Sequence, residues 1–317
     1  MVNKSLNTSA KKYEVGTAAM LKKDFIKNKT LYLLVLPMLI YYIVFHYAPM
    51  YGALIAFNDY SPRLGILGSP WVGFKHFVNF FSAPSFFSLL RNTVTISLTM
   101  LVVEFPSAII LALLMNELKS RRFSKVVQNI SYMPHFISLV VVCGMVKTFT
   151  MDNGILTTLL SYFGVPKETL LMNPKYFVPI YVGSGIWQQV GWNAIIYLAA
   201  LTGVNQSLYE AAAIDGAGKL KQLWHITLPG IMPTIVIMLI MRMGGILNVG
   251  YEKIILLYND VVMDVADVIS TYVYRKGLLE QSWSFSTAVN MFNSVINLIF
   301  LLGTNYLSRK LNDTSLW

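Results

Sequence analysis

The chain has 317 residues, of which 55% are hydrophobic and only 13% are charged. Soluble domains carry about twice that charged fraction, so a mainly soluble protein is excluded. The net charge of +10 does not indicate nucleic acid, because most Lys and Arg residues flank apolar runs, where they indicate membrane topology and contact with anionic lipid.

The segment at residues 1–30 is polar and rich in lysine, and we expect it to form a basic cytoplasmic arm. A helix that crosses the hydrocarbon core needs roughly 20 apolar residues. Six runs of suitable length follow, at about residues 31–57, 93–115, 126–149, 177–204, 233–257 and 285–307. They predict an all-α membrane protein with one transmembrane domain, residues 31–308, and a cytoplasmic tail at 309–317.

The distribution of Lys and Arg orients these six predicted helices. With the N-terminus placed in the cytoplasm, 15 basic residues lie on the cytoplasmic side and 7 on the outside. Cytoplasmic loops carry the excess of basic residues, so both termini are predicted to be cytoplasmic. The loop at residues 205–230, between the fourth and fifth helices, then faces the cytoplasm as well.

Polar residues inside the second and fourth predicted helices are candidates for a functional site. Glu104 lies deep in the second, where a cation or a helix carbonyl would be its partner. The fourth carries Gln188, Gln189, Trp192 and Asn193. Amides and aromatic rings suit the hydroxyl edges and CH faces of a sugar, although Trp and Gln near a helix end also occur in interfacial belts.

The loop at 205–230 contains the run EAAAIDGA at residues 210–217. Ser207 with Glu210 three residues later predicts a capping box, and the small side chains of Ala211 and Ala212 would let the helix seat in a partner's groove. Asp215 and Gly216 are expected to end this helix. A second short helix is predicted at about residues 219–226. The sequence therefore predicts a cytoplasmic coupling helix between transmembrane helices 4 and 5.

The neighbouring stretch GAGK, at residues 216–219, is not a phosphate-binding loop. The pattern requires a Gly five residues before the Gly-Lys pair and a Ser or Thr after it, but Ala213 and Leu220 stand there. We expect no cofactor in this chain and no enzymatic activity of its own. If ATP drives the protein, a separate subunit binds the ATP and its Mg²⁺.

The last two predicted helices also carry polar residues. Arg242 and Asn248 belong to the fifth, and Asn290, Asn293 and Asn297 share one face of the sixth. Arg242 either lines a cavity, where it would favour an acidic sugar such as a uronate, or reaches towards the cytoplasmic headgroups. The asparagines either contact substrate or bond neighbouring helices.

The EAAAIDGA run, closed by Leu228-Pro229, resembles the coupling loop of permeases in the ATP-binding-cassette importers. Further stretches are similar to a Gram-positive branch of carbohydrate permeases, the lipoprotein and polysaccharide type: residues 29–33, 51–57, 68–73, 131–138 and 267–278. By this resemblance, Glu210, Ala211, Ala212, Asp215 and Gly216 couple to an ATPase. Sugar-contacting positions would map onto Gln188, Gln189, Trp192 and Arg242, and we add Asn193, Asn248 and Asn293 as polar residues at membrane depth.

The resemblance implies an assembly in the bacterial plasma membrane. This chain would pair with a second, homologous permease, two cytosolic ATPase subunits and an extracytoplasmic solute-binding lipoprotein that delivers an oligosaccharide. A permease for another solute is the main alternative. An ion-coupled secondary transporter is less favoured because Glu104 is the one mid-membrane carboxylate. An intramembrane enzyme or a scaffold would leave the loop unexplained.

Overall fold

The computed structural model describes residues 24–312 and 314–317 and divides the chain into two units, residues 1–54 and 55–317. In the described residues nearly all regular structure is helical, and the β structure is limited to one bridge between Asn58 and Trp71. The prediction of a helical protein is therefore confirmed. Most of the expected basic arm, residues 1–23, lies outside the described residues.

One long apolar helix begins in the first unit and ends at Phe57, just inside the second. It consists of α2 (Lys29–Tyr42), the π-turn η1 (Ile43–Tyr47) and α3 (Ala48–Met50), and it continues through the 3-10 turn η2 (Tyr51–Phe57). Together these segments span 29 residues, enough to cross a membrane. The π-turn lies just before Pro49, which has no N–H to donate to the preceding turn.

The second unit is a set of helices joined by short connections. Its α-helices are α4 (Gly65–Gly68), α5 (Lys75–Phe81), α6 (Phe86–Thr99), α7 (Phe105–Asn116), α8 (Arg121–Tyr132), α9 (Leu139–Phe149), α10 (Ile155–Ser161), α11 (Pro174–Thr202), α12 (Gln206–Ile214), α13 (Lys219–Gln222), α14 (Leu228–Met243), α15 (Tyr251–Leu257), α16 (Met263–Ala266), α17 (Ile269–Tyr274) and α18 (Trp283–Asn312). The 3-10 turns η4 (Met133–Phe136) and η5 (Leu170–Met172) and the π-turns η3 (Met100–Glu104), η6 (Leu223–Thr227) and η7 (Arg275–Leu279) link some of them.

Four helices of the described chain are long and apolar enough to span a membrane: Lys29–Phe57, Phe86–Asn116, Lys219–Met243 and Trp283–Lys310. A bent pair, α8 with η4 and then α9, makes a fifth if it counts as one span. The 29-residue α11 lies where the fourth span was predicted, but it is not one of these four helices.

The third predicted span is not one straight helix, which corrects the expectation for residues 126–149. The segments Arg121–Phe136 and Leu139–Phe149 meet at 100°. Pro134 begins the break, Ile137 is extended, and the Ser138 side chain restarts the helix by accepting a hydrogen bond from Val141 N. A proline followed by an N-cap serine ends one helix and starts another.

The fifth predicted span, residues 233–257, is also corrected. The continuous helix starts at Lys219 and ends at Met243, and residues 244–250 form an irregular segment before α15. Glycines at 244, 245 and 250 weaken helix formation there. Asn297 stabilises the irregular backbone, because its Oδ1 accepts a hydrogen bond from Leu247 N at 3.0 Å.

α11 is the central helix of the second unit and packs along α7. Small residues such as Ala108, Ala112 and Ala194 are fully or almost fully buried in this contact and bring the backbones close together. Gly191 permits a still closer approach, because a Cβ atom there would lie 2.1 Å from the carbonyl oxygen of Ser131 at the end of α8. The bent α8–α9 pair is thereby held against α11.

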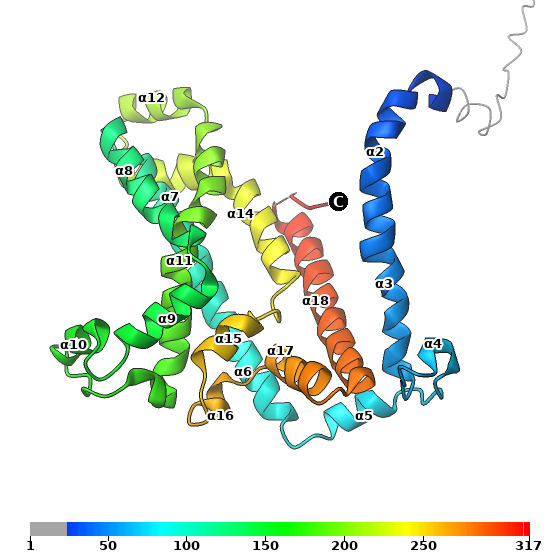
Figure 1. Cartoon of the computed structure of the whole chain (residues 1–317). Coiled ribbons are helices and arrows are strands. Elements are labelled where there is room, and N and C mark those ends of the chain that lie inside the picture. The colour runs from blue at the N-terminus through cyan, green and yellow to red at the C-terminus, as the bar shows by residue number, and fades with distance from the viewer. Residues whose placement is uncertain (1–23, 313) are drawn as a thin grey trace, which may run out of the picture. The chain divides into compact units, whose positions relative to one another are not determined.

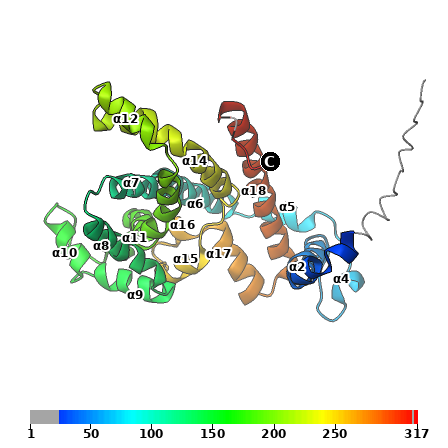
Figure 2. The same ribbon diagram turned by 90° about the horizontal axis from the view of Figure 1, so that it is seen from above.

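The two ends of the second unit differ in their elements. Figure 1 shows α12 lying across one end, whereas α15, α16 and α17 gather towards the other. α14 and α18 pack on one another between these ends. Viewed from above in Figure 2, α12 lies on the same side as α14, apart from α8 and α9.

Candidate functional site

Helix α12, the predicted coupling helix, begins two residues earlier than expected. Its N-cap is Asn205, whose Oδ1 accepts a hydrogen bond from Ser207 N at 3.0 Å. The predicted capping box of Ser207 and Glu210 is therefore wrong, because both residues lie inside the helix. Asn and Ser are about equally good N-caps, so residue preference alone does not decide between Asn205 and Ser207.

The end of α12 follows the prediction. Asp215 is the C-cap and Gly216 has a left-handed φ of 74°. Ala217 N donates to Ala212 O at 2.8 Å, and Gly216 N donates to Ala213 O at 3.1 Å. This pair of bonds is a Schellman motif, in which glycine avoids the steric cost of the left-handed backbone.

The predicted second short helix, residues 219–226, is not separate. α13 and the π-turn η6 continue directly into α14, so this part of the loop is rigidly joined to a transmembrane helix. α12 is tied to it by a hydrogen bond of 2.9 Å between Tyr209 OH and Thr227 Oγ1. A force on α12 is therefore transmitted to α14.

The outer side of this loop is exposed and partly apolar. Ile214 is 87% exposed, Leu220 74% and Trp224 66%, and Glu210 is also exposed. Nothing in the described chain covers these side chains, and together they form a surface suited to a protein partner. We call this surface, with α12, the coupling surface.

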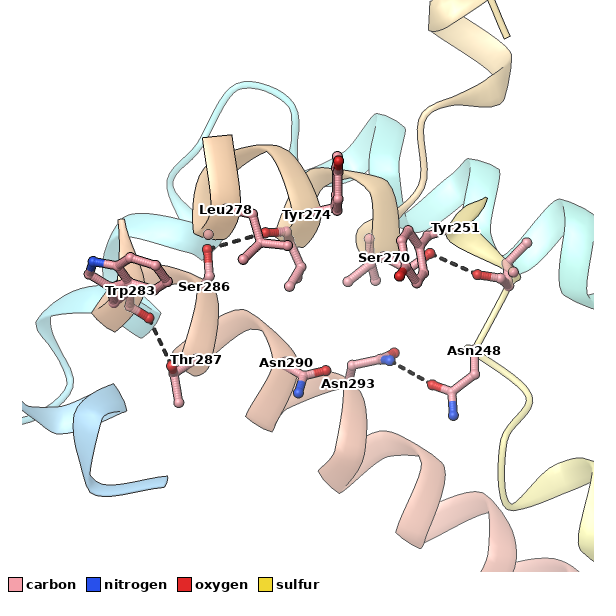
Figure 3. A pocket seen from close by; sticks show the side chains of 15 residues that line it. Asn248, Tyr251, Ser270, Tyr274, Leu278, Trp283, Ser286, Thr287, Asn290 and Asn293 are labelled. Carbon is pink, nitrogen blue, oxygen red and sulfur yellow. Dashed lines mark hydrogen bonds between the residues drawn. The ribbon is translucent and has the colours of Figure 1, made fainter. Parts of the chain in front are cut away.

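A cavity of about 540 Å³ lies towards the opposite end, between α17, η7, α18 and the segment before α15. Figure 3 shows Asn248, Asn293 and Asn290 on one side of it and Tyr251 and Tyr274 on the other, with Trp283 at one end. We call it the amide–aromatic cavity. Its volume lies in the range usual for small-molecule sites.

Asparagines at this cavity form a network that joins α18 to the irregular segment at residues 244–250. Asn248 Oδ1 accepts hydrogen bonds from Asn293 Nδ2 at 2.9 Å and from Asn297 Nδ2 at 3.0 Å. Asn293 Oδ1 is buried and makes no hydrogen bond within the described residues. Asn297 therefore holds the irregular segment against α18, whereas Asn248, Asn290 and Asn293 line the cavity.

Aromatic rings complete the cavity. Tyr251 and Tyr274 stack with ring centroids 5.6 Å apart and an interplanar angle of 26°. Ser270, which also lines it, donates to Val249 O at 2.8 Å and fixes α17 to the irregular segment. Rings beside amides and hydroxyls offer both a face and hydrogen bonds to a sugar.

Tyr251, Tyr274 and Trp283 were not singled out from the sequence. The continuous helix assumed for residues 233–257 hid the turn that brings Tyr251 beside α17. Tyr274 lies within the stretch 267–278 that resembles the permease family, and that stretch was the available pointer to it.

Arg242 lies in a second cavity, of about 270 Å³, together with Glu104 and Asn193. Its guanidinium is 3.9 Å from Glu104 Oε2, and its side chain is 38% exposed. Arg242 is near the C-terminal end of α14, about 21 Å along the helix from Leu228. It is therefore far from the coupling surface, and of the two expected positions it occupies the cavity. Glu104 has a cation as its partner.

Gln188, Gln189 and Trp192 surround the break between α8 and α9. Gln188 Nε2 donates to Ile137 O at 3.3 Å, Gln189 Oε1 lies 2.8 Å from His135 Nδ1, and Trp192 stacks on His135 at 4.3 Å. Gln188 is buried. The structure thus separates the seven predicted substrate residues into three groups, of which this one stabilises the fold.

The known proteins that this chain resembles are membrane components of transport systems. The model of the family described as binding-protein-dependent transport system inner membrane component matches residues 104–313. The polygalacturonan/rhamnogalacturonan transport system permease protein YteP of Bacillus subtilis is 45% identical over 293 residues, which cover 92% of this chain and 91% of that protein.

Two solved structures have similar folds. One belongs to a bacterial ABC transporter involved in the import of the acidic polysaccharide alginate, with a TM-score of 0.85 and 42% identity over 92% of this chain and 99% of that one. The other is the alginate transporter in complex with an alginate pentasaccharide-bound periplasmic protein, with a TM-score of 0.86 and 41% identity over 93% and 99%.

Proposed function

Because the chain belongs to the family of binding-protein-dependent transport system inner membrane components, we propose that it forms half of the pathway through which an ATP-driven importer takes up acidic oligosaccharides. As a member of this family it is a multi-pass permease subunit of an ABC transporter in the bacterial cell membrane.

The observation that carries the proposal is similarity over nearly the whole chain to a polygalacturonan/rhamnogalacturonan permease and to a transporter that imports the acidic polysaccharide alginate. The cavities support it. Arg242 offers a guanidinium to a carboxylate, for which the planar fork is well suited. The amide–aromatic cavity offers rings and amides to neutral parts of a sugar.

Six membrane crossings with both termini in the cytoplasm are the topology that we propose. The helices Lys29–Phe57, Phe86–Asn116, Lys219–Met243 and Trp283–Lys310 supply four. The bent α8–α9 pair and α11 supply the other two, since their polar and broken parts would be shielded by protein rather than by lipid. The excess of basic residues then places the coupling surface in the cytoplasm.

The coupling surface is proposed to dock onto a separate ATPase subunit through Glu210, Ala211, Ala212, Asp215 and Gly216. Small residues let α12 seat closely, and the exposed Ile214, Leu220 and Trp224 supply apolar contact. Because α13 continues into α14, movement of the ATPase would tilt a helix that bears Arg242. Nucleotide favours one state of the transporter only if the two states bind it with different affinity.

The remaining partners are a second, homologous permease, a second ATPase subunit and an extracytoplasmic solute-binding lipoprotein. Support comes from the family description, which names dependence on a binding protein, and from the alginate complex with its periplasmic protein. ATP and Mg²⁺ are proposed to bind to the ATPase subunits, and this chain is proposed to carry no catalytic site.

The test is uptake by the complete transporter in proteoliposomes, with its binding protein outside and ATP inside. We expect ATP-dependent accumulation of labelled trigalacturonate that exceeds accumulation of neutral maltotriose. Glu210→Ala should abolish stimulated ATP hydrolysis while the two permeases remain together. If neither sugar accumulates, the proposal is contradicted and another solute is favoured. If Glu210→Ala leaves stimulated ATP hydrolysis unchanged, the proposal is also contradicted and another driving force is favoured.

A further inference from the structure

Two charged side chains, Glu104 and Lys253, are buried in the transmembrane part. Glu104, at the end of η3, is 9% exposed, and Lys253, on α15, is 8% exposed. Lys253 Nζ donates to Tyr181 O at 2.7 Å and lies 4.6 Å from the Tyr181 ring centroid. Charged side chains at membrane depth are costly, and they usually serve a pathway or a partner.

Both charges border the same point of α11. A Cβ atom on Gly185 would lie 3.2 Å from Lys253 Nζ and 3.8 Å from Glu104 Oε2. On its other side Glu104 Oε2 is 3.9 Å from the Arg242 guanidinium. One carboxylate therefore lies between two cations contributed by α14 and α15, and the glycine leaves room for them.

The carboxylate is held loosely. Its Oε2 is buried and makes no hydrogen bond within the described residues. A separation of 3.9 Å attracts Arg242 electrostatically but is too long for a hydrogen bond. Arg242 contributes to the wall of the 270 Å³ cavity, and its side chain is 38% exposed, whereas that of Glu104 is 11% exposed. The donors of Arg242 are thus accessible to a ligand, and Glu104 stands behind them.

We propose that Glu104 is a resident carboxylate that a uronate carboxylate displaces from Arg242 during transport, while Lys253 keeps the charge of Glu104 compensated. This inference rests on the proposed function, since it specifies how that cavity selects an acidic sugar. Glu104 and Lys253 are positioning residues, and Arg242 contacts the sugar.

The exchange explains both selectivity and release. Glu104, Arg242 and Lys253 together carry one net positive charge, which one uronate carboxylate neutralises. A neutral sugar offers Arg242 no anion to replace Glu104, so it gains nothing from the exchange. Because Glu104 competes for the same guanidinium, the acidic sugar is bound weakly enough to leave, as conduction through a pathway requires.

The experiment measures equilibrium binding of trigalacturonate and of its methyl ester to the purified permease–ATPase complex, without the binding protein. The two ligands share ring type and length and differ in charge. Glu104→Gln should tighten binding of the acid about tenfold, since the competitor is removed, and leave the ester unchanged. Lys253→Met should weaken binding of the acid several-fold, and Arg242→Gln should weaken it about tenfold or more.

The double variant Glu104→Gln with Arg242→Gln should lose the tightening, because the two residues are coupled through one guanidinium. Glu104→Asp keeps the charge and should give an intermediate affinity, which covers the case in which Glu104→Gln fails to assemble. Glu117→Gln removes the same charge at the end of the same long helix, about 20 Å away, and should change neither affinity.

Equal shifts for acid and ester, or no shift in Glu104→Gln, would overturn the exchange. Binding of neither ligand to the wild-type complex would also overturn it. Uptake of trigalacturonate by the wild-type proteoliposomes reports separately on the proposed function, so the two failures are distinguishable.

Discussion

The coupling surface and the cavities of the transmembrane part are built in opposite ways. The coupling loop is assembled from neighbours in sequence: Asn205 caps α12, and the bonds of the Schellman motif join residues three and five positions apart. The cavities join residues that are distant, such as Asn248 with Asn293 and Arg242 with Glu104. Local changes should therefore act on coupling alone, whereas packing changes should act on the whole second unit.

The largest effect is expected from Gly191→Ala. The added Cβ atom would lie 2.1 Å from the carbonyl oxygen of Ser131, and this backbone atom cannot move away without distorting the end of α8. We expect a loss of about 3 kcal/mol in stability, from overpacking at a helix contact. Thermal unfolding of the detergent-solubilised complex measures it. Gly183→Ala, on the same helix with open space around its Cβ position, is the matched control, and equal melting temperatures for the two variants would contradict the packing account.

Gly216→Ala comes next and should act on coupling without unfolding the protein. A side chain at a φ of 74° costs about 1–2 kcal/mol, which would tilt or loosen the end of α12. We expect sugar-stimulated ATP hydrolysis to fall about tenfold while the melting temperature changes little. Gly218→Ala, where φ is −69° and the Cβ position is open, should retain hydrolysis. A fall in both variants would mean that bulk rather than backbone geometry matters there.

Tyr274→Ala probes the amide–aromatic cavity. Loss of its ring removes stacking against Tyr251 and a face for a sugar, and aromatic contacts of this kind are worth about 0.5–1.5 kcal/mol beyond their buried area. We expect the rate of oligosaccharide uptake to drop several-fold, with ATP hydrolysis in the absence of sugar unchanged. Tyr274→Phe keeps the ring and should keep most of the uptake. Full uptake by Tyr274→Ala would remove this cavity from the pathway.

The smallest effect separates Asn205 from Ser207. Asn205→Ala removes the N-cap and should destabilise α12 by about 1 kcal/mol. Ser207→Ala should change the stability of α12 little, because Ser207 is the second residue of the helix and its side chain does not provide the cap. Protection of the α12 amides in hydrogen exchange reports on both. The reverse order would restore the capping box that the sequence pattern favoured.

The differences between prediction and structure follow the same division. The end of α12 was predictable because Asp215 and Gly216 specify a local backbone geometry. Its start was missed by two residues because Asn205 and Ser207 compete for one cap. The break at Pro134 was missed because a proline within an apolar run is tolerated in many membrane helices, and only the contact with Gly191 and Gln188 accommodates the bend.

The residues predicted to contact substrate lie in three different surroundings in the structure. Gln188, Gln189 and Trp192 have the composition of a sugar site, and in the structure they contact the bent α8–α9 pair. Arg242 and Asn193 line one cavity, and Asn248 and Asn293 another. Composition identifies residues that need polar partners, but it does not say whether the partner is protein or solute.

By itself the sequence determined that this is a helical membrane protein, the position of helix α12 and the permease family, because hydropathy, local caps and a contiguous motif depend on neighbouring residues. Only the tertiary structure decided that Glu104 lies between Arg242 and Lys253, and that Tyr251 and Tyr274 face the asparagines of α18. Those arrangements depend on where the chain bends at residues 134–138 and 244–250, and the bends are stabilised by contacts between segments that are far apart along the chain.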